Sequence, residues 1–159
     1  MNSNNVLVSL TEPRYQPELN CFRKEVLLFF LGQELARAER YSSFVSFALF
    51  RIDGESALRS ALTKVASSLG KNIRRTDYLG QYDGRTLAVI LLNSKVENTA
   101  RVSQRLVEEI LVHTRDEYPD VQIGVASAVF PTEANSFETI RQLVLSRLEN
   151  REQGEPFFS

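Results

Sequence analysis

The sequence predicts one α/β domain, an α+β sandwich with a ferredoxin-like βαββαβ core and an extra helix at each end. Two observations lead to this fold class. Apolar residues recur at helical spacing in four segments, and four apolar runs of strand length lie between them. The inner elements follow the order strand, helix, strand, strand, helix, strand, which is the split βαβ pattern of ferredoxin-like folds. We expect the domain to cover residues 19–154, between an N-terminal arm over 1–18 and a tail over 155–159.

The pattern of apolar residues predicts each element in turn. Intervals of three and four indicate a first helix that begins at Leu19 and ends near Tyr41. The segment FVSFALFRI that follows is nearly continuous in apolar residues, as in a strand covered on both faces. The last strand alternates and is closed by Pro131. The other predicted elements are helices over 57–69, 96–111 and 137–148, and strands over 44–52, 77–81, 87–92 and 121–130.

A tight hairpin is predicted between the strands over 77–81 and 87–92. The pair Asp83-Gly84 lies between them. Asp-Gly suits a type I′ turn, in which both central residues need positive φ. We therefore expect Asp83 and Gly84 at the tip of the hairpin.

Composition excludes several classes of function. The net charge of −1 provides no general attraction to nucleic acid or to an anionic membrane. No apolar run reaches the roughly 18–20 residues that span a bilayer, and the N-terminus lacks a signal-peptide pattern. Cys21 is the only cysteine, so the chain has no disulfide framework and no thiolate metal cluster. We expect a cytoplasmic protein with neither nucleic-acid nor membrane partners.

Few residues suit catalysis or metal binding. His113 is the only histidine, and it is expected at the solvent-facing end of a helix. Zinc and a histidine-based nucleophile are therefore disfavoured, and there is no glycine-rich phosphate loop. Asp53 follows the first strand and could hold magnesium. The favoured alternative is that Asp53-Gly54 turns the chain and caps the next helix.

Two segments together resemble the GGDEF domains of the diguanylate cyclase family. ELARAERYSSFVSFALFRID resembles the family's opening helix and strand, and RRTDYLGQYDGRTLAVILL resembles its signature hairpin. AVFP followed by a helix is similar to the family's last strand and helix. The resemblance covers about residues 22–154 and implies a nucleotide-cyclase-like fold. It assigns the five signature positions to Asp83, Gly84, Arg85, Thr86 and Leu87.

The departures from the family pattern imply that the chain is not an enzyme. In the family, acidic hairpin residues and a strand-end aspartate hold metal ions against GTP. Here the hairpin positions are Arg85 and Thr86, and the strand-end metal position is Arg51. Arginine and threonine are not the oxygen ligands that hard cations require. We expect no metal, no cofactor and no synthesis of cyclic di-GMP.

The resemblance implies that the product-binding site found in many members of the family is retained. In the family it consists of an Arg-x-x-Asp before the hairpin and an arginine on the next helix, and the matching residues are Arg74, Asp77 and Arg105. A guanidinium can pair with guanine or phosphate, and a carboxylate can accept from guanine N–H groups. With Arg75 as a supporting cation, these residues predict a cyclic di-GMP receptor, a binding module for a bacterial second messenger.

Other interpretations remain open at the level of sequence. Arg74 and Asp77 could form only a surface ion pair, or Asp77 could anchor the turn before the strand. Arg105 could be a solvated residue. The alternative function is a protein interaction module without nucleotide binding, which forms a homodimer or binds a signalling protein. Its surface would be the apolar stripe of Phe22, Val26, Phe29 and Phe30 on the first helix, for which core packing is the favoured explanation. Binding of GTP without turnover is a minor alternative.

Overall fold

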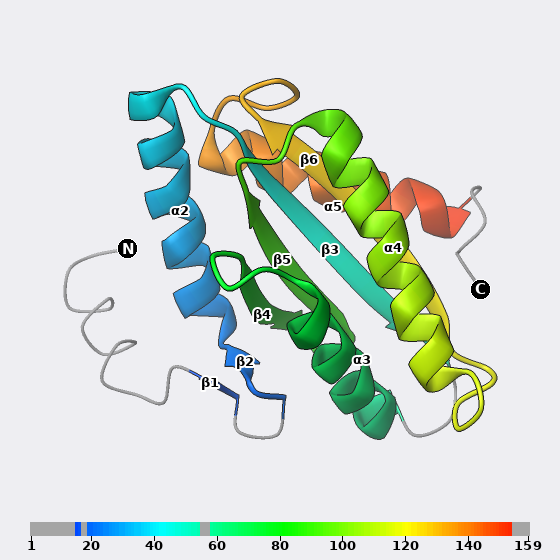
Figure 1. Ribbon diagram of the computed structural model, residues 1–159. Helices are drawn as coiled ribbons and strands as arrows, with labels where there is room; N and C mark the ends of the chain where they lie inside the picture. The colour runs from blue at the N-terminus through cyan, green and yellow to red at the C-terminus, as the bar shows by residue number, and fades with distance from the viewer. Residues whose placement is uncertain (1–14, 17–18, 55–57, 154–159) are drawn as a thin grey trace.

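The computed structural model describes residues 15–16, 19–54 and 58–153. Its elements follow the predicted order, with two additional short strands near the N-terminus (Figure 1). In chain order they are β1 (Tyr15–Gln16), β2 (Cys21–Phe22), α2 (Lys24–Tyr41), β3 (Val45–Asp53), α3 (Leu58–Asn72), β4 (Tyr78–Asp83), β5 (Thr86–Leu92), α4 (Val96–Thr114), β6 (Gln122–Phe130) and α5 (Phe137–Gln153).

The central sheet has the predicted ferredoxin-like core. Its six strands lie in the order β1-β2-β4-β5-β3-β6. The strands β3, β4, β5 and β6 pair antiparallel, and β2 joins the edge of β4 in parallel. Because β3 and β5 are antiparallel neighbours, with Arg51 opposite Thr86, the end of β3 lies beside the tip of the β4–β5 hairpin. The predicted fold class is confirmed.

Helices cover both faces of the sheet. On one face α3 and α4 lie side by side, and on the other lie α2 and α5 (Figure 1). Alternate residues of β3 enter the two cores: Phe50 packs with the α3 and α4 side, and Phe47 packs with the α2 and α5 side. Both rings are fully buried. This explains why most of β3 is apolar rather than alternating.

The predicted start of the first helix is wrong by five residues. Helix α2 begins at Lys24, not at Leu19. Asn20 has a positive φ of 52°, which ends any helical run there. The next two residues form β2, in which Phe22 lies opposite Gly80 of β4. Apolar spacing alone could not distinguish these residues from a first helical turn because the strand that joins them to the main sheet, β4, is about sixty residues away in the sequence.

The predicted type I′ turn is also wrong. Thr86 pairs with Asp83, so the two connecting residues are Gly84 and Arg85 rather than Asp83 and Gly84. A type I′ turn needs two residues with positive φ, but neither Gly84 nor Asp83 has a positive φ. The register shifts between Gln81 and Asp83, and this irregularity alters the local twist of the strands. The Asp83 Oδ1 accepts a hydrogen bond from the Arg85 N–H at 2.9 Å, which holds the turn.

Burial of Cys21 leads to a prediction for its reactivity. The side chain is 1% exposed, and burial raises the pKa of the thiol to about 11. Since the thiolate is the reactive form, we expect alkylation at pH 8 to be at least about 100-fold slower in the folded chain than in urea. Mass spectrometry of timed iodoacetamide reactions measures both rates. Equal rates in the folded and unfolded chain would show that β2 does not bury this thiol.

Candidate functional site

The connection from α3 to β4 holds Arg74 and Asp77. The Arg74 Nε and Nη2 atoms each donate to a carboxylate oxygen of Asp77 at 3.1 Å. The backbone N–H groups of Arg74 and Leu92 also donate to this carboxylate, at 3.0 and 3.1 Å. Asp77 therefore joins the connection to the end of β5, and its side chain is only 1% exposed. The anchoring role considered for this residue agrees with these contacts.

Arg74 is held in a fixed orientation but remains accessible. Its guanidinium forms a two-point contact with Asp77, and Nη2 donates in addition to the carbonyl of Leu92. More than half of its side chain, 55%, is exposed. A guanidinium that is oriented by a buried carboxylate loses less freedom when it binds an anion than a mobile one does.

Helix α4 brings Arg105 to the same place. The Arg105 Nη2 donates to the carbonyl of Asn72, the last residue of α3, at 3.2 Å. Arg74, Asp77 and Arg105 line one pocket of about 240 Å³. The remaining lining residues are Asn72, Ile73, Leu91, Ser94, Asn98 and Val102.

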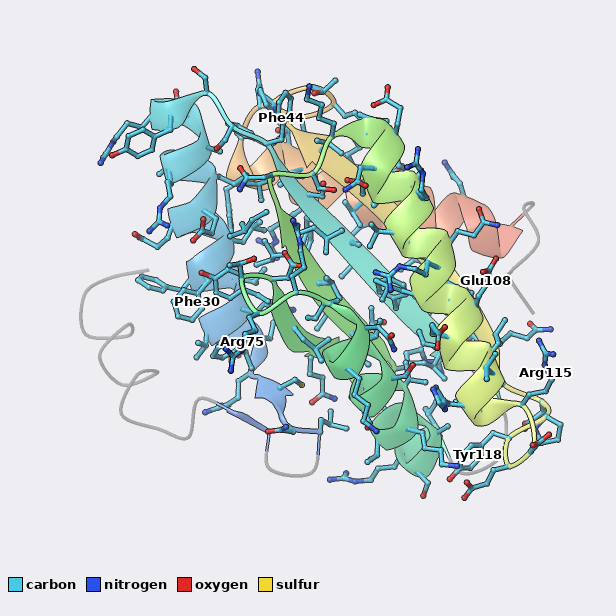
Figure 2. All side chains as sticks on the ribbon, viewed as in Figure 1. Phe30, Phe44, Arg75, Glu108, Arg115 and Tyr118 are labelled. Atoms are coloured by element: carbon cyan, nitrogen blue, oxygen red, sulfur yellow. The ribbon has the colours of Figure 1, made fainter. Side chains whose placement is uncertain are left out.

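Arg75 does not line the pocket that contains Arg105. It lines a second pocket of about 680 Å³, which Arg74 and Asp77 also border but Arg105 does not. In Figure 2 its label lies near the N-terminal end of α2, and Phe22 of the neighbouring β2 belongs to the same pocket. Three of the four predicted ligand residues therefore share one pocket, and the fourth borders the adjacent one.

The five signature positions form the hairpin tip and the start of β5. Asp83 and Gly84 lie at the solvent-exposed turn, whereas Thr86 and Leu87 are buried at 1% and 0% exposure. Arg85 extends from the turn to the end of β3, where its Nη1 donates to Asp53 Oδ1 at 3.0 Å. This ion pair was missed from sequence because Arg85 in the hairpin turn and Asp53 at the end of β3 are 32 residues apart in the chain.

The residues at this end of the sheet do not fit a divalent cation. The Asp53 carboxylate is paired with Arg85, and Arg51 lies in register with Thr86 two residues earlier on β3. Arg85 neutralises the Asp53 carboxylate, and Arg51 adds a further positive charge to the same end of β3, so the local charge disfavours a cation. Among the residues that the structure describes, no three acidic, histidine or cysteine side chains gather as metal ligands.

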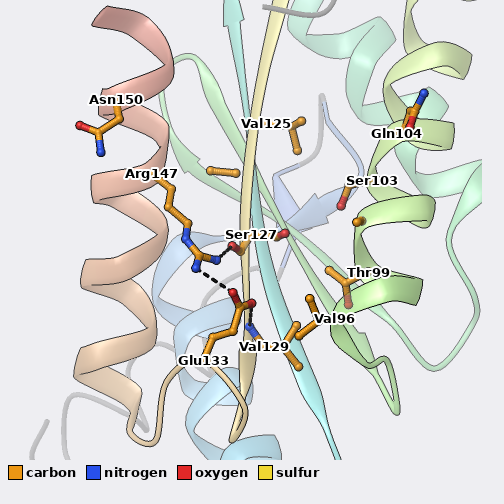
Figure 3. Close-up of a pocket in the computed structure, with 12 residues that line it drawn as sticks. Val96, Thr99, Ser103, Gln104, Val125, Ser127, Val129, Glu133, Arg147 and Asn150 are labelled. Carbon is orange, nitrogen blue, oxygen red and sulfur yellow. Dashed lines mark hydrogen bonds and ion pairs between the residues drawn. The ribbon is translucent and has the colours of Figure 1, made fainter. Parts of the chain in front are cut away.

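A third pocket of about 500 Å³ lies between α4, α5 and the outer edge of β6 (Figure 3). Arg147 donates to the Ser127 carbonyl and to Glu133 Oε2, both at 2.7 Å. Glu133 Oε1 in turn accepts from the Val129 N–H at 3.2 Å. The two side chains thus form hydrogen bonds with the Ser127 carbonyl and the Val129 N–H of the edge strand β6. These backbone groups are then not available for pairing with another strand.

This ion pair leads to a stability prediction. Arg147→Ala leaves the Ser127 carbonyl and the Glu133 carboxylate without their shared donor. Because both side chains are partly exposed, we expect a loss of only about 1 kcal/mol in the free energy of unfolding. Urea denaturation followed by circular dichroism measures it, with Arg40→Ala on the exposed surface of α2 as the control. A loss no larger than that of the control would mean that the pair adds nothing to stability.

The aromatic stripe of the first helix is partly core and partly surface. Val26 is buried, whereas Phe22, Phe29 and Phe30 are half-buried. The Phe30 ring stacks on Tyr78 of β4 with 5.1 Å between centroids, and it lies 5.3 Å from Phe22 (Figure 2). Burial, together with a hydrogen bond to Glu34, raises the pKa of Tyr78. Packing therefore explains much of the stripe.

Other predicted surface features agree with the structure. His113 is exposed near the end of α4, where its Nε2 lies 3.9 Å from Glu109. None of the helices in the described ranges combines the length and the apolar character needed to cross a bilayer.

A sequence model described as "Diguanylate cyclase, GGDEF domain" matches residues 24–154. The chain belongs to the GGDEF family. Solved structures agree with this GGDEF fold. The GGDEF domain of DgcB from Caulobacter crescentus, in complex with c-di-GMP, is 15% identical with a TM-score of 0.78, over 89% of this chain and 88% of that one. No curated protein matched the chain.

Two further GGDEF structures, both from Pseudomonas aeruginosa, show the same fold. The GGDEF domain of TpbB (YfiN) is 12% identical with a TM-score of 0.77, over 88% of this chain and 90% of that one. The diguanylate cyclase SiaD, in complex with its activator SiaC, is 15% identical with a TM-score of 0.77, over 94% of this chain and 62% of that one. At these identities the structures establish the fold of this GGDEF domain, not its ligand.

Proposed function

We propose that this GGDEF domain is a catalytically inactive receptor for cyclic di-GMP in the bacterial cytoplasm. The observation that carries the proposal is the convergence of Arg74, Asp77 and Arg105 on one pocket. The family comparison supports the choice of ligand because the structure of DgcB contains c-di-GMP.

Arg74 supplies the main contact with the ligand. Its exposed guanidinium can pair with a phosphate or with the O6 and N7 atoms of guanine. The oxygens of Asp77 already accept four hydrogen bonds, three from Arg74 and one from Leu92. The role we assign to Asp77 is therefore to position the Arg74 guanidinium. Arg105 adds a second cation from α4, and Arg75 adds charge at the neighbouring pocket.

Inactivity is proposed from the residues at the signature positions. A cyclase must neutralise triphosphate charge and activate the attacking hydroxyl with metal ions. Arg51 and the Arg85–Asp53 pair oppose cation binding at the place where the family holds its metals. We expect no cyclic di-GMP from GTP with either Mg²⁺ or Mn²⁺, measured by chromatography at high protein concentration. Turnover that disappears on adding EDTA would contradict this part of the proposal.

A second candidate function is a protein interaction module. It is favoured by the half-exposed rings of Phe29 and Phe30 on α2 and by the fact that the related SiaD structure contains a protein activator. Sedimentation equilibrium across a concentration series distinguishes the candidates. A nucleotide-independent dimer that Phe29→Ser dissociates would favour the interaction module. A monomer that binds cyclic di-GMP favours the receptor.

A further inference from the structure

The outer edge of β6 has no neighbouring strand in the part of the chain that the structure describes. β6 ends the strand order and pairs only with β3. In an antiparallel pair, successive residues direct their N–H and C=O groups alternately toward the partner strand and away from it. The Ser127 carbonyl and the Val129 N–H bond to side chains outside β3, so the odd-numbered residues of β6 face outward. The N–H and C=O groups of Val125 and the N–H of Ser127 therefore lie along this edge.

The same edge borders the pocket of about 500 Å³ between α4 and α5 (Figure 3). Along β6 the pocket extends from Val125 to Val129. At about 3.3 Å per residue this stretch is about 13 Å long, which matches four residues of an extended chain. Because α4 and α5 cover opposite faces of the sheet, a segment lying beside β6 would have a helix on each side, as a strand within the sheet has.

One wall of this pocket carries a hydroxyl group without a partner. Ser103 lies on α4 and points toward β6 in Figure 3. It is only 6% exposed, and its Oγ has no hydrogen-bond partner among the described residues. Buried hydroxyl groups in folded proteins are nearly always hydrogen-bonded. The unpaired Oγ therefore indicates that a ligand with a polar group completes this wall.

The charges of the pocket favour an uncharged ligand. Among the described residues that line it, only Arg147 and Glu133 are charged, and they pair with each other at 2.7 Å. The pocket thus offers no unpaired cation to a phosphate group and no unpaired carboxylate to a basic ligand. The same two side chains occupy backbone groups at one end of the edge, which sets where a pairing segment must stop.

We propose that an extended, uncharged segment of a partner protein adds to the outer edge of β6 as a further strand of the sheet. Its main chain pairs with Val125 and with the N–H of Ser127, and one of its polar side chains bonds to Ser103. In strand addition, main-chain hydrogen bonds supply the affinity and side-chain contacts supply the specificity. The site is independent of the proposed receptor function, since this pocket shares no lining residue with the pocket of Arg74 and Arg105.

Amide chemical shifts measured by nuclear magnetic resonance test the strand addition. The probe is the capped peptide Lys-Thr-Val-Thr-Val-Thr-Lys, whose central residues favour strands and whose lysines provide solubility. The control peptide is N-methylated at its five central residues, which removes their donors. The peptide is titrated into the wild-type chain, Ser103→Ala, Ser103→Leu and Ser60→Leu. Ser60 is an exposed serine of α3 outside the pocket and serves as the matched control. Circular dichroism establishes that each variant is folded.

The expected result is a saturable shift of the Val125 and Ser127 amides in the wild-type chain and in Ser60→Leu, with half-saturation below about 1 mM. We expect at least about threefold weaker binding to Ser103→Ala and about tenfold weaker binding to Ser103→Leu, whose side chain fills the pocket. No shift along β6 with the probe overturns the strand addition, and so does unchanged affinity in both Ser103 variants. Equal binding of the methylated peptide overturns it as well, because the pocket would then bind side chains without main-chain pairing. None of these results bears on the receptor function, because no nucleotide is present.

Discussion

Asp77→Ala is expected to destabilise the domain by about 3 kcal/mol. The Asp77 carboxylate is 1% exposed and accepts hydrogen bonds from two backbone N–H groups and from the Arg74 guanidinium. Its removal takes away the shared acceptor of four hydrogen bonds, two from the backbone N–H groups of Arg74 and Leu92 and two from the Arg74 guanidinium, at about 0.5–1.5 kcal/mol each. In a domain of this size the loss corresponds to a fall of roughly 6–12 °C in Tm.

Differential scanning calorimetry measures this loss, and Arg74→Ala is its matched control. Arg74→Ala removes the side-chain partner of Asp77 but leaves both backbone donors paired. Because Arg74 is mostly exposed, we expect it to cost less than about 1 kcal/mol. Asp77→Asn, which retains one carbonyl oxygen, should lie between the two if the alanine variant is too unstable to measure. Equal Tm values for Asp77→Ala and the wild-type chain would show that Asp77 does not anchor the connection.

Arg74→Ala is expected to weaken cyclic di-GMP binding by about 10–100-fold with little change in stability. A charge-assisted hydrogen bond contributes about 1.5–3 kcal/mol, which corresponds to this range of affinity. Arg74→Lys should recover only part of the loss, because an ammonium carries the charge but cannot make the paired contact. Calorimetric titration of the three proteins measures these differences.

The matched control for this loss is Arg101→Ala, an exposed arginine on α4 one turn from Arg105 that lines neither pocket. We expect it to bind as the wild-type chain does. An affinity of Arg74→Ala equal to that of the wild-type chain would remove Arg74 from the site, even if the domain binds the ligand elsewhere.

Much of the fold could be predicted from the sequence because the signals are local. The apolar run of β3 and the helical spacing of α3 and α4 arise from residues that are neighbours in the chain. The features that were mispredicted depend on distant partners. Phe22 is in a strand because it pairs with Tyr15 of β1 and with Gly80 of β4, and the hairpin turn follows an irregularity in the β4–β5 register.

The candidate site was predictable in its residue types but not in its geometry. The Arg-x-x-Asp spacing indicated Arg74 and Asp77, and the chain order indicated Arg105. The sequence could not reveal that the Asp77 carboxylate is buried and accepts a hydrogen bond from the Leu92 N–H, since this depends on how β5 ends beside the connection. It also could not show that Arg75 lies outside the pocket that Arg74 shares with Arg105, because consecutive residues of an irregular connection can border different pockets.

The receptor function is tested most directly by calorimetric titration of the purified chain with cyclic di-GMP, with GTP in the presence of Mg²⁺ as the comparison. We expect saturable, low-micromolar or tighter binding of cyclic di-GMP to the wild-type chain, about 10–100-fold weaker binding to Arg74→Ala, and no turnover of GTP. A folded wild-type chain that gives no heat with cyclic di-GMP would contradict the receptor function and favour the protein interaction module.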